Sequence, residues 1–200
     1  MTGCRLSEDQ LRAAVAFHGH WCPGLALGVR AAELALEEVG PSGDEDVVAV
    51  TETDMCAVDA VQVLTGCTFG KGNLLFVDHG KVAFSFFRRE DGKALRFFLR
   101  PPRREEELPP RAPELPSPQS PQREEERRLR RCDEILGADL AELFQRTEVR
   151  FLLPPEARRR ATLSCFRCGE PFMESRGRLL EGHPVCLHCF EAEDPRLFRR

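Results

Sequence analysis

The chain has 200 residues, of which 42% are hydrophobic, and a formal net charge of −4 at pH 7. This length suits one medium domain with a small satellite, or two small domains, and the apolar content is sufficient for a packed core. The net acidic charge argues against nucleic acid as the main partner, and no apolar run approaches the roughly 18 to 20 residues of a membrane span.

The first third of the chain predicts helices around a short loop that contains two histidines. Ser7 and Gln10 form the pattern of a capping box, which opens a first helix. After the loop HGHWC, Pro23 suits the first position of a second helix, because its missing N–H would be unpaired there in any case. The β-branched run VVAVTET predicts a strand. The expected elements are helices at 8–17, 23–39 and 55–64 and a strand at 47–53.

Three strand candidates follow: LLFVDHG, KVAFSFFRR and KALRFFLR. The turns between them contain Asp78-His79-Gly80 and Asp91-Gly92, which are typical of hairpins. Consecutive hairpins predict an antiparallel meander. The expected fold class is therefore α+β, with an antiparallel sheet flanked by helices.

A proline-rich segment at 101–122 interrupts this pattern. It carries eight of the fifteen prolines, mixed with arginine, glutamate and serine. Such a composition buries too little apolar surface to offset its ordering entropy, so we expect a flexible surface insertion. Helices at 124–136 and 139–144 and a strand at 147–153 are expected after it. This second block is too small to stand alone, so residues 1–157 are expected to form one core.

Four cysteines near the C-terminus form two Cys-x-x-Cys turns with seventeen residues between them: Cys165, Cys168, Cys186 and Cys189. Two such turns supply four thiolates, the ligand set of a structural zinc site, and leave no open position for a substrate. Glycines after the first turn and before the second predict a treble-clef module at 161–195. A pair of redox disulfides is the alternative. The N-terminus lacks a signal peptide's apolar stretch, however, which predicts a cytoplasmic location where thiols stay reduced.

A second group of thiols and imidazoles lies at predicted helix starts. Cys22 directly precedes Pro23 and so occupies an N-cap, where backbone N–H groups and the helix dipole favour a thiolate. Cys56 lies in the first turn of the third helix, and His18 and His20 alternate with Cys22 in one loop. These groups suit zinc or a similar borderline-soft metal. Each cysteine could instead be a small apolar core residue, and each histidine could satisfy loop carbonyls.

Three further residues lie near these thiols in sequence. Asp59 could face the site as a catalytic group, or it could face solvent. Cys67 stands at the mouth of the loop GCTFGKGN, and Lys71 lies within it. This loop is not a P-loop, because only three residues separate its first two glycines and Lys71 is followed by glycine. A glycine-rich loop that binds a cofactor and a plain tight turn both remain open.

Several separated motifs occur in the order of a known family: FHGHWCPGLALGVRAAELAL, ETDMCAVDAVQVLTGCTFGKGNL and FFRREDGKALR. They closely resemble the FmdE family, which takes its name from formylmethanofuran dehydrogenase. The C-terminal SCFRCGEPFMESRGRLLEGHPVCLHC is similar to the zinc finger appended to many members. The resemblance implies an α+β core, a treble-clef finger and an intertwined homodimer. It also implies a pocket whose matching positions are His18, His20, Cys22, Cys56, Asp59 and Cys67.

The family resemblance suggests an association with the molybdenum or tungsten enzyme that reduces carbon dioxide onto methanofuran. The first hypothesis is an accessory protein of such an enzyme, which holds or passes a metal or cofactor through the core thiols. The second is a metal-dependent enzyme or oxidoreductase component with a His/Cys active site, in which a zinc with an open position acts as a Lewis acid. The third is a regulatory or interaction protein that uses its zinc finger.

Overall fold

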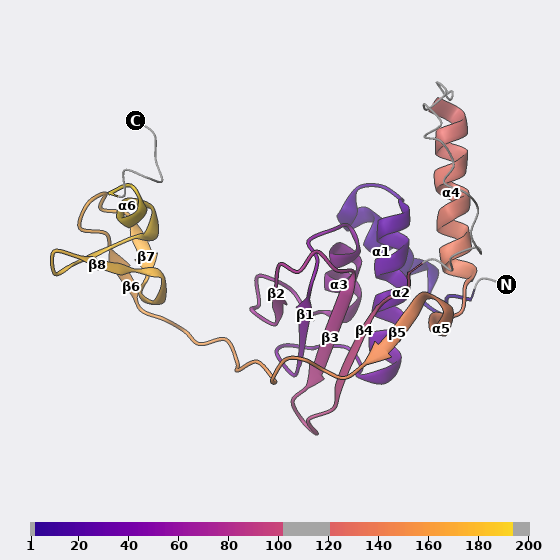
Figure 1. Ribbon diagram of the computed structural model, residues 1–200, viewed down its shortest axis with the longest axis horizontal. Helices are drawn as coiled ribbons and strands as arrows, with labels where there is room; N and C mark the ends of the chain where they lie inside the picture. The colour runs from indigo at the N-terminus through magenta and orange to yellow at the C-terminus, as the bar shows by residue number, and fades with distance from the viewer. Residues whose placement is uncertain (1–2, 102–120, 194–200) are drawn as a thin grey trace, which may run out of the picture. The chain divides into compact units, whose positions relative to one another are not determined.

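The computed structural model describes residues 3–101 and 121–193. The chain forms two compact units, Met1–Glu156 and Ala157–Arg200 (Figure 1). The first unit holds the sheet and the long helices, and the second holds the four C-terminal cysteines. Most of the expected proline-rich insertion, 102–120, lies outside the described residues. Its last two positions belong to a helix that begins at Pro121.

Three helices form as the sequence predicts: α1 Glu8–His18, α2 Pro23–Glu38 and α3 Ala57–Thr65. Both hydrogen bonds of the predicted capping box are present before α1. The backbone N–H of Gln10 donates to the Ser7 hydroxyl at 3.3 Å, and the backbone N–H of Ser7 donates to the Gln10 side chain at 2.9 Å. Pro23 opens α2 directly after its Cys22 cap. No helix among the described residues is long and apolar enough to cross a membrane.

The sheet of the first unit has five strands in the order β2-β1-β3-β4-β5. Their bounds are β1 Val47–Thr51, β2 Leu74–Phe76, β3 Ala83–Arg88, β4 Ala94–Leu99 and β5 Phe144–Thr147. The predicted hairpin between β3 and β4 is confirmed, since these strands pair antiparallel across the Asp91-Gly92 turn. The sheet is therefore mainly antiparallel and flanked by helices.

The expected meander is wrong at its first strand. β2 does not pair with β3; it lies parallel to β1, with Ala49 opposite Leu74. The reason is that α3 connects β1 to β2 as a crossover, and a helical crossover returns the chain in a parallel direction. The segment containing Asp78-His79-Gly80 then leads past the end of β1 to β3 and forms no two-stranded hairpin.

The last strand of the first unit also lies earlier than expected. α4 Pro121–Gly137 and α5 Leu140–Leu143 precede β5, which pairs with β4 so that Phe144 opposes Leu99. The prediction of a strand at 147–153 is wrong except at Thr147, the last residue of β5. Phe144 is buried, whereas Leu152 is 92% exposed. The strand therefore forms at the position that buries the Phe144 ring in the core.

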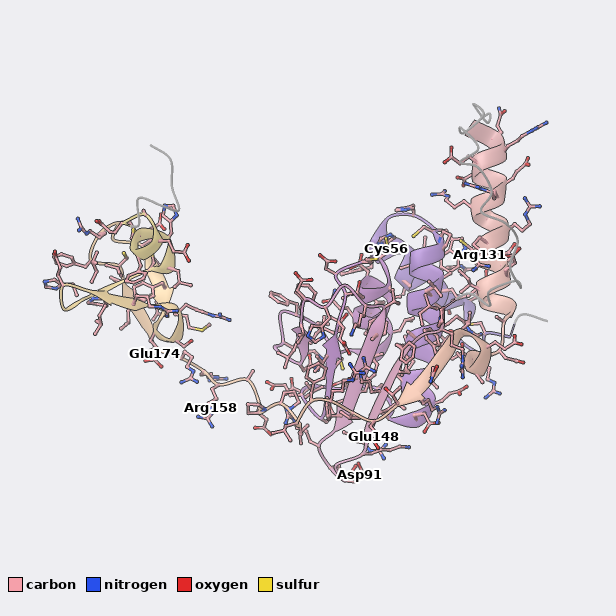
Figure 2. The ribbon with its side chains drawn as sticks, in the orientation of Figure 1. Cys56, Asp91, Arg131, Glu148, Arg158 and Glu174 are labelled. Atoms are coloured by element: carbon pink, nitrogen blue, oxygen red, sulfur yellow. The ribbon has the colours of Figure 1, made fainter. Side chains whose placement is uncertain are left out.

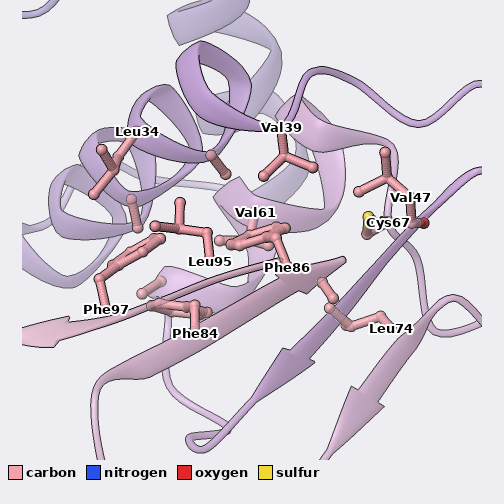
Figure 3. Close-up of a cluster of buried hydrophobic side chains, with 14 of the residues drawn as sticks. Leu34, Val39, Val47, Val61, Cys67, Leu74, Phe84, Phe86, Leu95 and Phe97 are labelled. Carbon is pink, nitrogen blue, oxygen red and sulfur yellow. Dashed lines mark hydrogen bonds between the residues drawn. The ribbon is translucent and has the colours of Figure 1, made fainter. Parts of the chain in front are cut away.

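The main hydrophobic core lies between one face of the sheet and helices α2 and α3 (Figure 3). Phe97 is central to it, with ring centroids 6.0 Å from Phe84 and Phe86 and 5.2 Å from Phe144. The opposite face of the sheet is also buried, although no long helix of the described residues covers it. The Arg89 guanidinium donates to the Pro154 carbonyl at 2.8 Å, and the rings of His79 and Phe151 stack at 6.4 Å. The segment that follows β5 thus covers this second face.

The second unit is built from two short hairpins and a terminal helix. The first hairpin pairs β6 Thr162–Ser164 with β7 Pro171–Met173, and the 3-10 helix η1 Glu174–Arg176 follows it. The second hairpin pairs β8 Arg178–Leu180 with β9 His183–Val185. The helix α6 Leu187–Glu191 comes after the second hairpin. The β8–β9 turn has Glu181 at φ 53° and Gly182 at φ 85°. Two consecutive positive φ angles are the geometry of a tight two-residue hairpin.

Candidate metal centres

The four C-terminal cysteines converge as their spacing predicts. All four sulfur atoms lie within 4.8 Å of one another. Cys165 and Cys168 come from the turn after β6, and Cys186 and Cys189 from the cap and first turn of α6. A knuckle, a hairpin and a helix that carries the last two ligands form the predicted treble-clef arrangement. The four thiolates could hold one metal ion in a closed tetrahedral shell, which is compatible with zinc.

Backbone N–H groups prepare this site for negative charge. The N–H of Cys186 donates to the Cys165 sulfur at 3.3 Å, and the N–H of Cys189 donates to the Cys186 sulfur at 3.5 Å. Burial opposes ionisation of Cys165, but N–H donors from Cys168, Cys186 and Arg167 lower its pKa to about 6. Burial and the neighbouring thiols raise the pKa of Cys189 to about 12. Cys165 is therefore easier to ionise than Cys189, and a bound cation would favour the thiolate form of Cys189.

A second cluster forms in the loop between α1 and α2. The ligand atoms of His18, His20 and Cys22 lie within 4.8 Å of one another. The Cys22 sulfur caps α2, accepting from the Leu25 N–H at 3.4 Å, and it lies 3.7 Å from His18 Nε2. Cys22 is buried, His18 is half-buried and His20 is exposed. This gradient gives the cluster one anchored end and one end open to solvent.

Asp59 faces this cluster, although its side chain remains partly exposed to solvent. His18 Nδ1 donates to Asp59 Oδ2 at 2.7 Å, across 41 positions of sequence. A carboxylate only accepts hydrogen bonds, so the proton stays on Nδ1 and the lone pair of Nε2 points toward Cys22. Histidines that bind metals are usually oriented by a carboxylate in this way. The contact with Asp59 thus orients the His18 ring in a way that would suit a metal ligand.

Cys56 approaches the same place from the start of α3. A β-carbon built on Gly24 would lie 3.5 Å from the Cys56 sulfur and 3.9 Å from the Cys22 sulfur, so both sulfurs flank this glycine. Burial raises the pKa of the Cys56 thiol, and the neighbouring Cys22 raises it further. Cys56 itself occupies the cap position of α3, but its side chain makes no capping hydrogen bond. The Cys56 sulfur is thus a neighbour of Cys22, but it is not among the three ligand atoms that lie within 4.8 Å of one another.

Cys67 and Lys71 lie apart from this cluster. The Cys67 thiol donates to the Val47 carbonyl at 3.5 Å inside the main core (Figure 3), and burial raises its pKa to about 11. Lys71 Nζ donates to the Asp44 carbonyl at 3.2 Å. Cys56 and Cys67 stand at opposite ends of α3, which has nine residues and is about 13 Å long. The expectation that Cys67 shares the pocket is therefore corrected: it is a core thiol.

The sequence did not predict the surroundings contributed by α4. A groove of about 420 Å³ opens beside Pro23, the residue after Cys22. Its other lining residues come from α4: Glu124, Arg127, Arg128 and Arg131. Figure 2 places Cys56 and Arg131 at the same end of the unit, opposite the Asp91 hairpin tip. Because α4 follows the insertion, its position beside α2 could not be read from local spacing.

Comparisons with known proteins agree with this architecture. The sequence profile described as "FmdE, Molybdenum formylmethanofuran dehydrogenase operon" matches residues 17–145. The crystal structure of a tungsten formylmethanofuran dehydrogenase FmdE-like protein from Syntrophus aciditrophicus superposes with a TM-score of 0.62 and 26% identity, covering 94% of this chain and 93% of that one.

A curated relative from Archaeoglobus fulgidus is named "Probable S-adenosyl-L-methionine-binding protein". It is 43% identical over 101 residues, which is 48% of this chain. The chain covers only 27% of that protein's length. The profile match spans more than half of the chain and includes the His18–His20–Cys22 loop, Cys56 and Asp59. The chain therefore belongs to the FmdE family, as its motifs predict.

Proposed function

We propose that this protein binds two metal ions, a structural zinc at the four C-terminal cysteines and a more labile ion at the core cluster. We further propose that it handles a metal or cofactor as an accessory to molybdenum- or tungsten-dependent enzymes of the formylmethanofuran dehydrogenase type. The family description and the name of the Syntrophus relative support the association. The observation that carries the core site is the Asp59-oriented His18 beside His20 and Cys22.

The chemistry of the core ligands suits exchange of the ion. Imidazole and thiolate together favour zinc or another borderline-soft ion. Two of the three ligands in the loop are at least partly accessible, and His20 is exposed. Cys22 and Asp59 anchor the buried side, while His20 can release the ion to a partner. A site intended only for stability would be closed on all sides.

A metal-dependent enzyme is the second candidate. Three ligand atoms from the loop leave a fourth position open if Cys56 stays uncoordinated, and an open position is what distinguishes catalytic zinc from structural zinc. A zinc ion there would supply Lewis-acid polarisation of a substrate oxygen. Asp59 and His18 would hold a proton at Nδ1, and the groove of α4 arginines would attract a negatively charged substrate.

We also propose a homodimer in the cytoplasm. Phe17 is 59% exposed and Met55 is 60% exposed, and these apolar side chains directly precede His18 and Cys56 in the chain. Large apolar side chains next to a functional cluster are typical of surfaces that a partner covers. A second copy would also shield the open side of the cluster from water.

Metal content per chain tests the core site. We expect two metal ions per wild-type chain and one in Cys22→Ser, with the far-UV circular dichroism unchanged. Asp59→Asn keeps every ligand but should weaken the core ion about 10- to 100-fold. Cys4→Ser is the matched control, because Cys4 belongs to neither cluster, and it should retain both ions.

The possible outcomes separate the proposals. A single ion that survives Cys22→Ser would rule out the core site and favour the regulatory zinc-finger alternative. If a chelator removes the core ion within minutes and leaves the second ion in place, the handling role is supported. If the core ion is retained tightly with a bound water, the enzyme candidate is favoured instead.

A further inference from the structure

A second cavity lies at the end of β4, outside the metal centres. It has a volume of about 440 Å³. Four of its lining residues are basic and four are not: Lys81, Arg96, Arg100 and Arg150, with Val82, Phe98, Leu99 and Pro101. No acidic side chain is among these lining residues. The cavity thus combines an apolar wall with an excess of positive charge.

Arg96 is a buried and oriented cation within this cavity. Its side chain is 2% exposed. Arg96 Nε donates to Glu52 Oε1 at 2.8 Å, a terminal nitrogen lies 2.7 Å from the same oxygen, and the other terminal nitrogen donates to the Thr147 hydroxyl at 2.8 Å. These partners use three of the five guanidinium N–H groups, so two remain for a ligand. A cation held in place this way loses little entropy when it binds an anion.

Lys81 and Arg150 supply charge that no acidic side chain balances. Both are exposed, and within residues 3–101 and 121–193 neither forms an ion pair. Arg100 adds a third positive charge, since its guanidinium donates only to neutral acceptors among the described residues, the Ala141 carbonyl at 2.9 Å and the Gln145 side chain at 3.4 Å. Glu52 offsets the charge of Arg96, so the net positive charge of the cavity comes from Lys81, Arg100 and Arg150.

Another cavity of the unit, which Arg30 and Glu33 of α2 line, does not share this property. It measures about 730 Å³ and is lined by residues of both signs. Arg5 pairs there with Glu37 at 2.9 Å, and Arg30 pairs with Glu33 at 3.1 Å. Paired charges leave little net potential for a ligand. These ion pairs distinguish this cavity from the one at the end of β4, whose lining holds no acidic side chain.

We infer that this cavity binds a small organic oxyanion, a carboxylate or a phosphate monoester attached to an apolar body. The oxyanion lies between Arg96, Lys81 and Arg150, where planar guanidinium groups can donate paired hydrogen bonds. The apolar body packs against Val82 and Phe98, both half-buried. The volume lies within the range of small-molecule sites. This anion site is independent of the proposed metal function, so the failure of either proposal would leave the other unaffected.

Calorimetric titration of the full chain tests the inference with three probes of similar shape. Benzoate and phenyl phosphate carry the two oxyanions, and benzamide is the uncharged analogue of benzoate. We expect one or both anions to bind and benzamide not to bind. Binding of only one anion identifies the head group of the natural ligand. Lys81→Gln/Arg150→Gln should weaken binding at least about tenfold, since it removes two of the three positive charges that no acidic side chain balances.

Arg130→Gln is the matched control, because Arg130 is exposed on α4 and does not line the cavity. It should leave the affinity of the anions unchanged. The exposed positions 81 and 150 are substituted in place of Arg96, whose loss would strand Glu52 in the core. The inference is overturned if neither anion binds at concentrations up to about 10 mM. It is also overturned if benzamide binds as well as benzoate, or if the double variant binds the anions as the wild type does.

Discussion

Two carboxylates in the first unit orient basic side chains by accepting hydrogen bonds from them. Asp59 fixes the tautomer of His18 at 2.7 Å, and Glu52 accepts from both Arg96 and His79. Glu52 is completely buried. Burial alone would raise its pKa, but the hydrogen bonds from His79 and Arg96 lower the pKa below its usual range. Its charged form is thus the one that the fold stabilises.

Glu52→Gln should destabilise the first unit at pH 7 by about 3–5 kcal/mol, because Arg96 would keep a buried charge without its counter-ion. A lowered native pKa stabilises the fold above the unfolded-state value of 4.5, and this contribution is lost as the pH falls through the native pKa. The difference between wild type and variant should therefore shrink below about pH 4.5. Urea unfolding followed at several pH values measures it.

Glu8→Gln is the control for this titration, since Glu8 is exposed and pairs only with Arg12 on the surface. It should change the free energy of unfolding by less than about 0.5 kcal/mol at any pH. A Glu52→Gln difference that is constant or grows as the pH falls would contradict the assigned charge state.

The approach of two helices brings the core thiols together. α2 and α3 pack closely at Gly28, where a β-carbon would lie 2.6 Å from Ala57 Cα and would also overlap the Ala57 carbonyl oxygen. Cys22 caps α2 and Cys56 occupies the cap position of α3, so the distance between the helices sets the distance between the sulfurs. The glycine thus serves the geometry of the site as well as the packing.

Gly28→Ala should destabilise the first unit by about 1–3 kcal/mol, because backbone atoms of α3 cannot move aside locally. It should also lower the metal content of the core site while the finger keeps its ion. Chemical denaturation and metal analysis measure the two effects. Gly70→Ala is the control, since a β-carbon there meets nothing within 4 Å. Equal stability of the two variants would show that the helices can separate at no cost.

The two units differ in what holds them together. The first unit has an extensive aromatic and aliphatic core, whereas the buried residues among the described part of the second unit are Cys165 and Val185. A core of that size cannot stabilise a fold of about forty residues alone. Structural zinc in such modules contributes folding free energy directly, on the order of 10–16 kcal/mol. The metal is therefore expected to be the core of the second unit.

Cys189→Ser should unfold the second unit and leave the melting of the first unit unchanged. Hydrogen exchange read by peptide mass spectrometry should show loss of protection over 162–191 only. Cys4→Ser should preserve protection in both units, because its thiol lies outside both clusters. Intact protection of the second unit after Cys189→Ser, or after zinc removal, would refute the structural role of the metal.

Local spacing was sufficient for the features whose partners lie close together in the chain. The capping box of Ser7 and Gln10, the cap position of Cys22 and the two Cys-x-x-Cys turns involve separations of about one helical turn. The treble-clef arrangement followed from glycines that permit the knuckle and the hairpin. Such features can be predicted from sequence because only a few consecutive residues decide their geometry.

Long-range pairing settled the remaining features. Asp59 could have faced solvent, and its contact with His18 depends on how α3 packs against α1. β2 joined β1 in parallel because a helical crossover connects them, which the apolar pattern of β2 does not reveal. Cys67 lies in the core because α3 separates it from Cys56. The sequence around each of the two cysteines had suggested the same thing, a thiol beside a helix. Burial and strand register depend on the free energy of the complete packing arrangement, to which all segments contribute. They therefore cannot be predicted from any single segment of the sequence.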